Sequence, residues 1–141
     1  MKRITLNNKT FDYLENLTMY EGQLHDDCRA SLSQETLEIY SISQLDTFFQ
    51  NFINCENQIL SKCVDDNANY LSTENGLLQV FDIDQEKEVL LSKQEVLKRC
   101  SFQGMLLDEH IVTVFMDTEG MIGDGVTEHI FEIKKIIENE I

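Results

Sequence analysis

Apolar residues recur at helical spacing in the middle of the chain, which predicts one long central helix. Ser43 is expected to cap it, with Asp46 three residues on as a short-armed capping-box partner. The apolar stripe of this helix comprises Leu45, Phe48, Phe49, Phe52, Ile53, Cys55, Ile59, Leu60 and Cys63. The polar run at 65–67 is expected to end the helix.

Three shorter helices are predicted where a capping residue precedes apolar residues at helical spacing. Thr10 is expected to cap the first of them, which ends near Gly22. Ser92 is expected to cap the second, and Glu95 completes its capping box. Thr127 is expected to cap the last helix of the chain.

Strands are predicted where apolar and polar residues alternate or where a short run is apolar on both faces. They cover residues 2–6, 36–42, 69–72, 77–84, 88–91 and 109–117. The dipeptide Asn75-Gly76 predicts a hairpin turn. The last strand is apolar on both faces, so we expect it to be central in its sheet. Residues 36–42 can also lead into the central helix, residues 24–33 favour neither structure, and residues 101–104 are expected to form a loop.

Together these elements predict a single α+β domain spanning residues 1–141. We expect a small, mostly antiparallel sheet packed against the long central helix and the C-terminal helix. The chain has 141 residues, the usual size of one domain, and 42% of them are hydrophobic, which is enough for an ordinary core. It contains no proline, no repeat and no linker-like tract.

The N-terminus and the cysteines predict a soluble cytoplasmic protein. Lys2 and Arg3 precede polar residues and no long apolar run, so we expect neither a signal peptide nor a membrane span. The four cysteines form no Cys-x-x-Cys pair and match no zinc-site spacing. We therefore expect free and mostly buried thiols.

Charge is the strongest compositional feature of the chain. Its formal net charge is −15, from 26 acidic against 11 basic residues. Such a field repels nucleic acids and anionic membranes and attracts cationic partners. Solubility alone is the other explanation of an acidic composition.

Residues 108–132 hold seven acidic residues and neither lysine nor arginine. Repulsion within such a segment destabilises a fold slightly, and a cationic partner would relieve it. We therefore expect these acids to form a partner-binding face. They are Asp108, Glu109, Asp117, Glu119, Asp124, Glu128 and Glu132.

Two acidic or glycine-rich patterns have simpler explanations than a ligand site. The segment 120–125 lacks the lysine of a phosphate loop, and Glu119 and Asp124 would repel a phosphate, so a flexible turn is expected. A second pattern is a row of alternating acids, namely Asp82, Asp84, Glu86 and Glu88. They could hold a metal or act as an acid–base pair, but such a row is more typical of a solvated edge strand.

The histidines and cysteines provide no motif for catalysis or metal binding. Neighbouring side chains fan out, so the runs His25-Asp26-Asp27-Cys28 and Asp108-Glu109-His110 are not expected to hold an ion. His129 is expected on the flank of the last helix. A catalytic pair of Cys28 with His110 stays open, because folding could bring the two together. We predict no catalytic residue, no metal and no cofactor.

In size and acidity the chain resembles small acidic inhibitors of basic enzymes, such as immunity proteins, antitoxins and phage-encoded nuclease blockers. This resemblance is one of composition and carries over no residue. It implies a protein that binds a basic toxin or nuclease and occupies its cationic, nucleic-acid-binding active site. Two other functions stay open: a small enzyme or ligand-binding domain with a pocket, and a structural or scaffold subunit.

Overall fold

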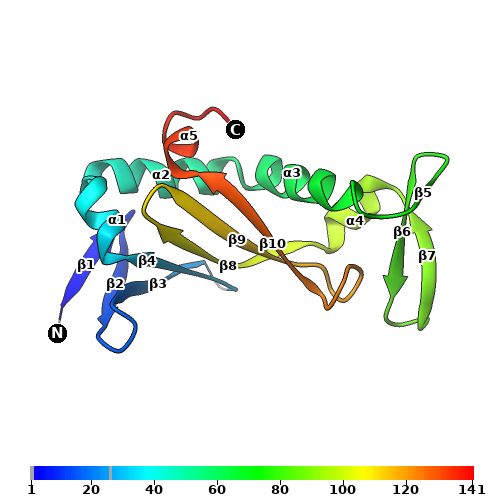
Figure 1. The fold of residues 1–141 in the computed structure, drawn as a ribbon, viewed down its shortest axis with the longest axis horizontal. Coiled ribbons are helices and arrows are strands. Elements are labelled where there is room, and N and C mark those ends of the chain that lie inside the picture. Colours follow the sequence, from blue (N-terminus) through cyan, green and yellow to red (C-terminus); the bar gives the residue numbers. More distant parts are fainter. Residues whose placement is uncertain (1, 26) are drawn as a thin grey trace.

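The computed structural model describes residues 2–25 and 27–141 (Figure 1). The first half of the chain forms β1 (Arg3–Leu6), β2 (Lys9–Leu14), β3 (Met19–His25), β4 (Cys28–Ser33), α1 (Gln34–Ile39), α2 (Ile42–Asn54) and α3 (Glu56–Ala68). The second half forms β5 (Thr73–Glu74), β6 (Leu77–Asp82), β7 (Lys87–Leu91), α4 (Lys93–Arg99), β8 (Ser101–Asp108), β9 (Ile111–Asp117), β10 (Val126–Glu132) and α5 (Ile133–Ile137).

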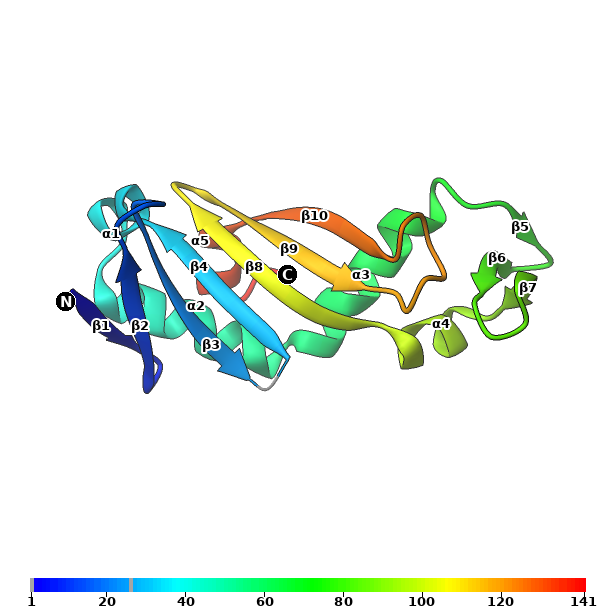
Figure 2. The same cartoon turned by 90° about the horizontal axis from the view of Figure 1, so that it is seen from below.

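Within the described residues, seven strands form one large sheet in the order β1-β2-β3-β4-β8-β9-β10 (Figure 2). Neighbouring strands are antiparallel except β4 and β8, which run parallel with Arg29 opposite Gly104. The sheet therefore consists of two antiparallel meanders, one from each half of the chain, which meet at this parallel pair. Because parallel strands need a crossover, the helices α1 to α4 and the short strands β5 to β7 lie between β4 and β8 in the chain.

This sheet corrects the predicted fold. The protein is α+β and its sheet is mostly antiparallel, but a small sheet packed on one long central helix is wrong. The main sheet has seven strands, and a second sheet has three. Three differences explain the error: β2 and β3 replace the predicted N-terminal helix, β8 runs through the predicted loop, and β10 replaces most of the predicted last helix.

Turn residues and one glycine explain why the N-terminal segment forms hairpins. Asn7 and Asn8 connect β1 to β2 at φ 50° and 63°, the left-handed values that a two-residue hairpin turn requires. In β3, Gly22 lies opposite Phe11. A Cβ at position 22 would lie 2.9 Å from Cγ of Phe11 and 2.7 Å from the Thr10 carbonyl oxygen. The glycine therefore makes room for a buried ring and does not end a helix.

The helices α2, α3 and α5 lie on the same face of the large sheet (Figure 1). On that face α2 contributes the fully buried rings of Phe48, Phe49 and Phe52. The Phe49 ring lies 5.5 Å from that of Phe11 in β2, and the Phe52 ring lies 5.1 Å from that of Phe102 in β8. One helix thus joins both meanders into a single core. No helix among the described residues is long and apolar enough to cross a membrane.

The predicted central helix is in fact two helices. α2 and α3 meet at Cys55, whose backbone leaves the helical region at φ −110° and ψ 17°. Ser41, and not Ser43, caps α2, and Gln44 completes the capping box. α3 then continues through the polar run that was expected to end it.

Three further predictions differ from the structure. Residues 34–39 form α1, capped by Ser33, where a strand was the first prediction for 36–42. Thr127 lies within β10 and caps no helix, and α5 has only five residues. β9 is the last but one strand of the sheet and has one half-exposed face, so it is not central.

β5, β6 and β7 form a separate sheet at one end of the molecule (Figure 1). The predicted turn at Asn75-Gly76 is confirmed, but the first strand of this hairpin is Thr73–Glu74 and not residues 69–72. The prediction of α4 is also confirmed, with Ser92 as its cap and Glu95 completing the capping box. The small sheet contacts the large one through the β9–β10 loop, where the backbone N–H of Phe81 donates to the Met121 carbonyl at 3.0 Å.

Candidate protein-binding face

One face of the large sheet carries no helix (Figures 1 and 2). In β9 the fully buried residues Val112, Val114 and Met116 point toward the helices. The alternate residues therefore point to the uncovered side. We call the uncovered side of β8, β9 and β10 the outer face. Its residues, from the register of the three strands, are Gly104, Leu106, Asp108, Ile111, Thr113, Phe115, Asp117, Val126, Glu128, Ile130 and Glu132.

The register arranges the outer face in rows that cross the three strands. Leu106, Thr113 and Ile130 form a central row. On one side of it, Ile111 lies between Asp108 and Glu132. On the other side, Phe115 lies between Gly104 and Glu128.

The centre of the outer face is apolar and partly open to solvent. Ile130 is 67% exposed and Ile111 is 41% exposed. Leu106 and Phe115, on the same face, are half-buried. Contiguous exposed apolar side chains bordered by polar ones are typical of protein-binding surfaces.

The acids that border these apolar residues have few basic neighbours. Residues 101–132 contain no lysine or arginine. Among the described residues, neither Asp108 nor Glu128 makes an ion pair, and Glu132 has only the exposed Lys135, at 3.4 Å. An exposed pair of this kind contributes little.

The other half of the same sheet surface is neutralised. Arg3 in β1 lies 2.8 Å from Asp12 in β2. Arg29 in β4 is paired with Glu21 in β3. Negative charge without a partner is therefore concentrated on the outer face and not over the whole sheet.

The structure separates the seven acids predicted as one partner-binding face. Asp108, Glu128 and Glu132 lie on the outer face, and Glu109 lies in the β8–β9 turn, where its N–H donates to Thr36. Asp117 lies at the other end of the outer face, with Glu119 and Asp124 in the loop beyond it, because β9 is about 20 Å long at the usual rise per residue.

Two acids at that far end hold the loop that follows β9. The Asp117 carboxylate accepts the Glu119 N–H at 2.9 Å, and the Asp124 carboxylate accepts the Val126 N–H at 3.4 Å. The loop 118–125 joins two strands, and not a strand and a helix as predicted, and it is held by internal hydrogen bonds. Thr118 is fully buried, and its hydroxyl donates to the Gly125 carbonyl at 3.0 Å.

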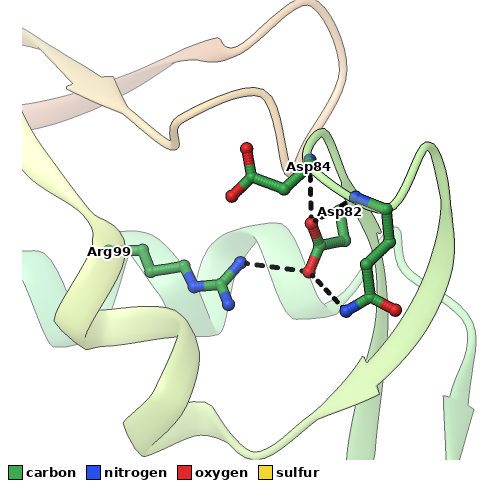
Figure 3. A network of polar contacts seen from close by, with 4 residues as sticks. Asp82, Asp84 and Arg99 are labelled. Carbon is green, nitrogen blue, oxygen red and sulfur yellow. Dashed lines mark hydrogen bonds and ion pairs between the residues drawn. The ribbon is translucent and has the colours of Figure 1, made fainter.

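Asp82, the first residue of the predicted acidic row, supports a turn (Figure 3). It is 5% exposed, so a solvated strand face is wrong for this residue. One carboxylate oxygen accepts the backbone N–H groups of Asp84 at 3.0 Å and Gln85 at 3.2 Å, and Arg99 lies 3.7 Å from the other. The Gln85 hydrogen bond is the largest influence on the Asp82 pKa. With the contributions from Asp84 and Arg99 it outweighs burial and lowers this pKa.

A polar network that the sequence did not indicate surrounds His129. This side chain is buried in β10 and does not lie on a helix flank. Its Nδ1 lies 2.9 Å from the Asp66 carboxylate of α3, and its Nε2 lies 2.8 Å from the Thr127 hydroxyl. The Asn67 amide donates to the same hydroxyl at 3.2 Å. These contacts attach α3 to the inner side of β10.

The network has the order of an acid, a base and a hydroxyl nucleophile, but its surroundings favour a structural role. Asn67 holds the Thr127 hydroxyl. The cavity beside His129 is lined by Lys62, Cys63, Asp66, Glu128, His129, Ile130 and Phe131, and Thr127 does not reach it. The hydroxyl therefore does not line that cavity, and it is already held by two polar partners.

The candidate pair of Cys28 and His110 is not assembled. Cys28 precedes Arg29, which lies beside Gly104, whereas His110 follows β8 at its other end, with Nδ1 3.3 Å from the Tyr40 hydroxyl. Burial, and to a lesser extent Glu56, raises the pKa of Cys28 to about 12.

All four cysteines are free, as predicted, and Cys28, Cys63 and Cys100 are buried. In the run at 25–28, His25 lies 3.1 Å from Glu56, and Asp26 lies outside the described residues. Across residues 2–25 and 27–141, no three His, Cys, Asp or Glu side chains gather as a metal site requires.

The outer face is thus an apolar centre bordered by acids on three strands. Comparisons of the chain with protein-family models, with curated proteins and with solved structures found no significant match.

Proposed function

We propose that the protein binds a basic, nucleic-acid-binding protein, such as a toxin or nuclease, and neutralises it by covering its cationic surface. The observation that carries this proposal is the outer face. Its acids have no basic residue between positions 101 and 132, while the acids of the neighbouring strands are paired.

The net charge of −15 supplies the long-range attraction. A field of one sign steers an oppositely charged partner and raises the rate of association. The same field repels nucleic acid. A partner whose cationic surface is covered by this protein therefore cannot bind nucleic acid at that surface. Inhibition then follows from occupancy and needs no reaction.

The apolar centre of the outer face supplies the short-range contact. Ile111, Phe115 and Ile130 offer aromatic and branched surface that a partner can bury. Energetically important interface residues lie near the centre of a patch, where water is excluded, and charges at the rim act mainly on association. The outer face has this arrangement, with apolar residues at its centre and acids at its rim.

Two triple variants with equal loss of charge test the proposal. The face variant carries Asp108→Asn, Glu128→Gln and Glu132→Gln. The control variant carries Glu38→Gln, Glu74→Gln and Glu86→Gln, three exposed residues away from the outer face. Each is titrated by calorimetry against the basic protein that co-purifies with the wild type from its own cells.

The face variant should bind at least roughly tenfold more weakly, because each lost close charge pair at an interface costs about 1.5 kcal/mol or more. The control should bind nearly as the wild type does. Melting temperatures of both should change little, since surface substitutions shift stability by about 0.5 kcal/mol or less. Equal affinities of the two variants would reject the outer face, and the absence of any basic partner would reject the proposed function.

A further inference from the structure

β10 forms one edge of the large sheet, because its only strand neighbour is β9. The hydrogen bonds at the two ends of this pair fix which backbone groups face outward. Beyond one end, the Thr118 N–H donates to the Gly125 carbonyl, and beyond the other the Ile133 N–H donates to the His110 carbonyl. Both pairs continue the register that places Val126 opposite Asp117.

Hydrogen-bonded and non-hydrogen-bonded pairs alternate along an antiparallel ladder. The odd-numbered residues of β10 therefore bond to β9, and the even-numbered ones turn their N–H and C=O groups away from it. Glu128 and Ile130 present a donor and an acceptor each at the free edge. Among the described residues no backbone or side-chain group bonds to them.

This edge borders a groove. A cavity of about 450 Å³ lies between α3 and β10, lined by Lys62, Cys63, Asp66 and the residues 128–131. The groove follows the strand edge, so an extended segment lying in it can reach the free backbone groups of Ile130. Side chains of such a segment point alternately to the outer face and toward α3.

The charges around the edge select the occupant. Glu128 and Glu132 lie on its outer side, and Asp66, which is 57% exposed, lies on the α3 side. Lys62 is the single lysine or arginine that lines the cavity. A second copy of this chain is disfavoured, because antiparallel pairing about Ile130 places Glu128 opposite Glu132 and joins two molecules of charge −15.

We propose that β10 and its groove bind an extended basic segment of the partner as an added strand of the sheet. This inference rests on the proposed function and specifies how the partner is recognised. Main-chain hydrogen bonds to the edge supply affinity in strand addition, and pockets for alternate side chains supply specificity. Lysine or arginine would alternate with apolar residues, the former beside Glu128 and Glu132 and the latter toward Phe131.

The test uses a short blocked peptide in which lysine and valine alternate, with a glutamate–valine peptide as its counterpart. Ile130→Pro removes one outward N–H and leaves the ladder to β9 intact, which proline on an edge strand allows. Ile130→Ala is the matched control, because it removes the apolar side chain and keeps the N–H.

Thr5→Pro is a second control, on the opposite edge of the sheet. The Tyr13 N–H donates to the Lys2 carbonyl, and this pair continues the β1–β2 register. By the same alternation Thr5 turns its N–H outward. A general effect of proline on an edge strand would therefore appear in this variant too.

The lysine–valine peptide should bind the wild type, and Ile130→Pro should weaken that binding at least about tenfold, because an edge hydrogen bond is lost and the ring blocks close approach. Ile130→Ala should lose less affinity, and Thr5→Pro should bind as the wild type does. Peptide binding should also protect the Ile130 amide from hydrogen exchange, a change that a side-chain contact alone would not produce.

Equal binding by the wild type and Ile130→Pro, or no binding of the lysine–valine peptide, would overturn strand addition. The proposed function would survive that result if the face variant still lost affinity for the whole partner. Equal binding of the glutamate–valine peptide would contradict the basic segment, and with it the charge argument for the proposed function. If both peptides bind equally but Ile130→Pro binds them more weakly than Ile130→Ala does, β10 would still be a site of strand addition, without a preference for basic segments.

Discussion

Acidic residues that look alike in the sequence have different roles in the structure. Asp82 accepts backbone hydrogen bonds in a buried turn, whereas Glu128 lies on an open strand without an ion pair. A carboxylate that accepts hydrogen bonds in the folded protein has a lowered pKa, and this makes the stability of the protein depend on pH. For an exposed acid on the outer face, we propose a role in binding instead.

Asp82 should therefore contribute to acid unfolding. Its folded-state pKa is lower than its ordinary value, so its stabilising effect is present above about pH 4, the unfolded value, and is lost as the pH falls through the folded value. The difference in unfolding free energy between the wild type and Asp82→Asn should be greatest above pH 4 and should shrink below it. Denaturant titrations at several pH values measure this difference, and a constant difference would contradict the role of Asp82.

Phe52→Ala should destabilise the protein by about 3–5 kcal/mol, as truncation of a buried aromatic residue does. Phe52 is fully buried, and its ring lies 6.2 Å from that of Phe48 and 5.1 Å from that of Phe102. Tyr70→Ala is the control, because Tyr70 is 86% exposed. Equal denaturant midpoints for the two variants would show that α2 does not pack on the sheet through Phe52.

The cysteines should be reduced and should differ in reactivity. Burial raises the pKa of Cys63 to about 12 and that of Cys100 to about 11, so both are protonated at pH 8, as is Cys28. Cys55 is only half-buried and should react first with a thiol reagent in the native protein. Unfolding without reductant should release all four thiols, and recovery of two or fewer would contradict the free cysteines.

Elements specified by local signals were predictable, and those specified by distant pairing were not. α4 follows from its capping box, and the β5–β6 hairpin follows from Asn75-Gly76. The segment of β10 fits both a helical and an alternating pattern, because Ile130 satisfies either. Only its pairing with β9 decides between them.

The composition of the candidate site could be predicted from the sequence, but the arrangement of its residues could not. The sequence reveals that residues 108–132 are acidic without a basic residue. It does not reveal that Asp108 and Glu132 share a row while Asp117 lies at the far end of the strand, because that depends on register. The edge position of β10 depends on strand order and had no signal in the sequence.

The contact between α3 and β10 should depend on the Thr127 hydroxyl. Thr127→Val leaves the buried Nε2 of His129 without its partner, which costs about 1–3 kcal/mol. Thr113→Val makes the same change on the outer face of β9, where no hydrogen bond is lost among the described residues, and should be nearly neutral. Equal unfolding free energies for the two variants would show that the network does not stabilise the α3–β10 contact.

At the scale of the whole molecule, charge and topology act together. The two meanders form one sheet, yet only the β1–β4 half pairs the acids of its surface with arginines. In the β8–β10 half, Asp108 and Glu128 make no ion pair among the described residues, Glu132 has only the exposed Lys135, and the half ends in a free edge. Within the large sheet, acids without an arginine partner are therefore gathered on the β8–β10 side.

The association rate constant, measured at increasing sodium chloride concentration, tests this account most directly. Steered association slows as salt shortens the reach of the field, which is about 8 Å at physiological ionic strength. The wild type and the control triple variant should lose about tenfold or more in rate between low and physiological salt. The face variant should start slower and lose much less. Parallel salt dependence for the face and control variants would contradict the outer face as the binding surface.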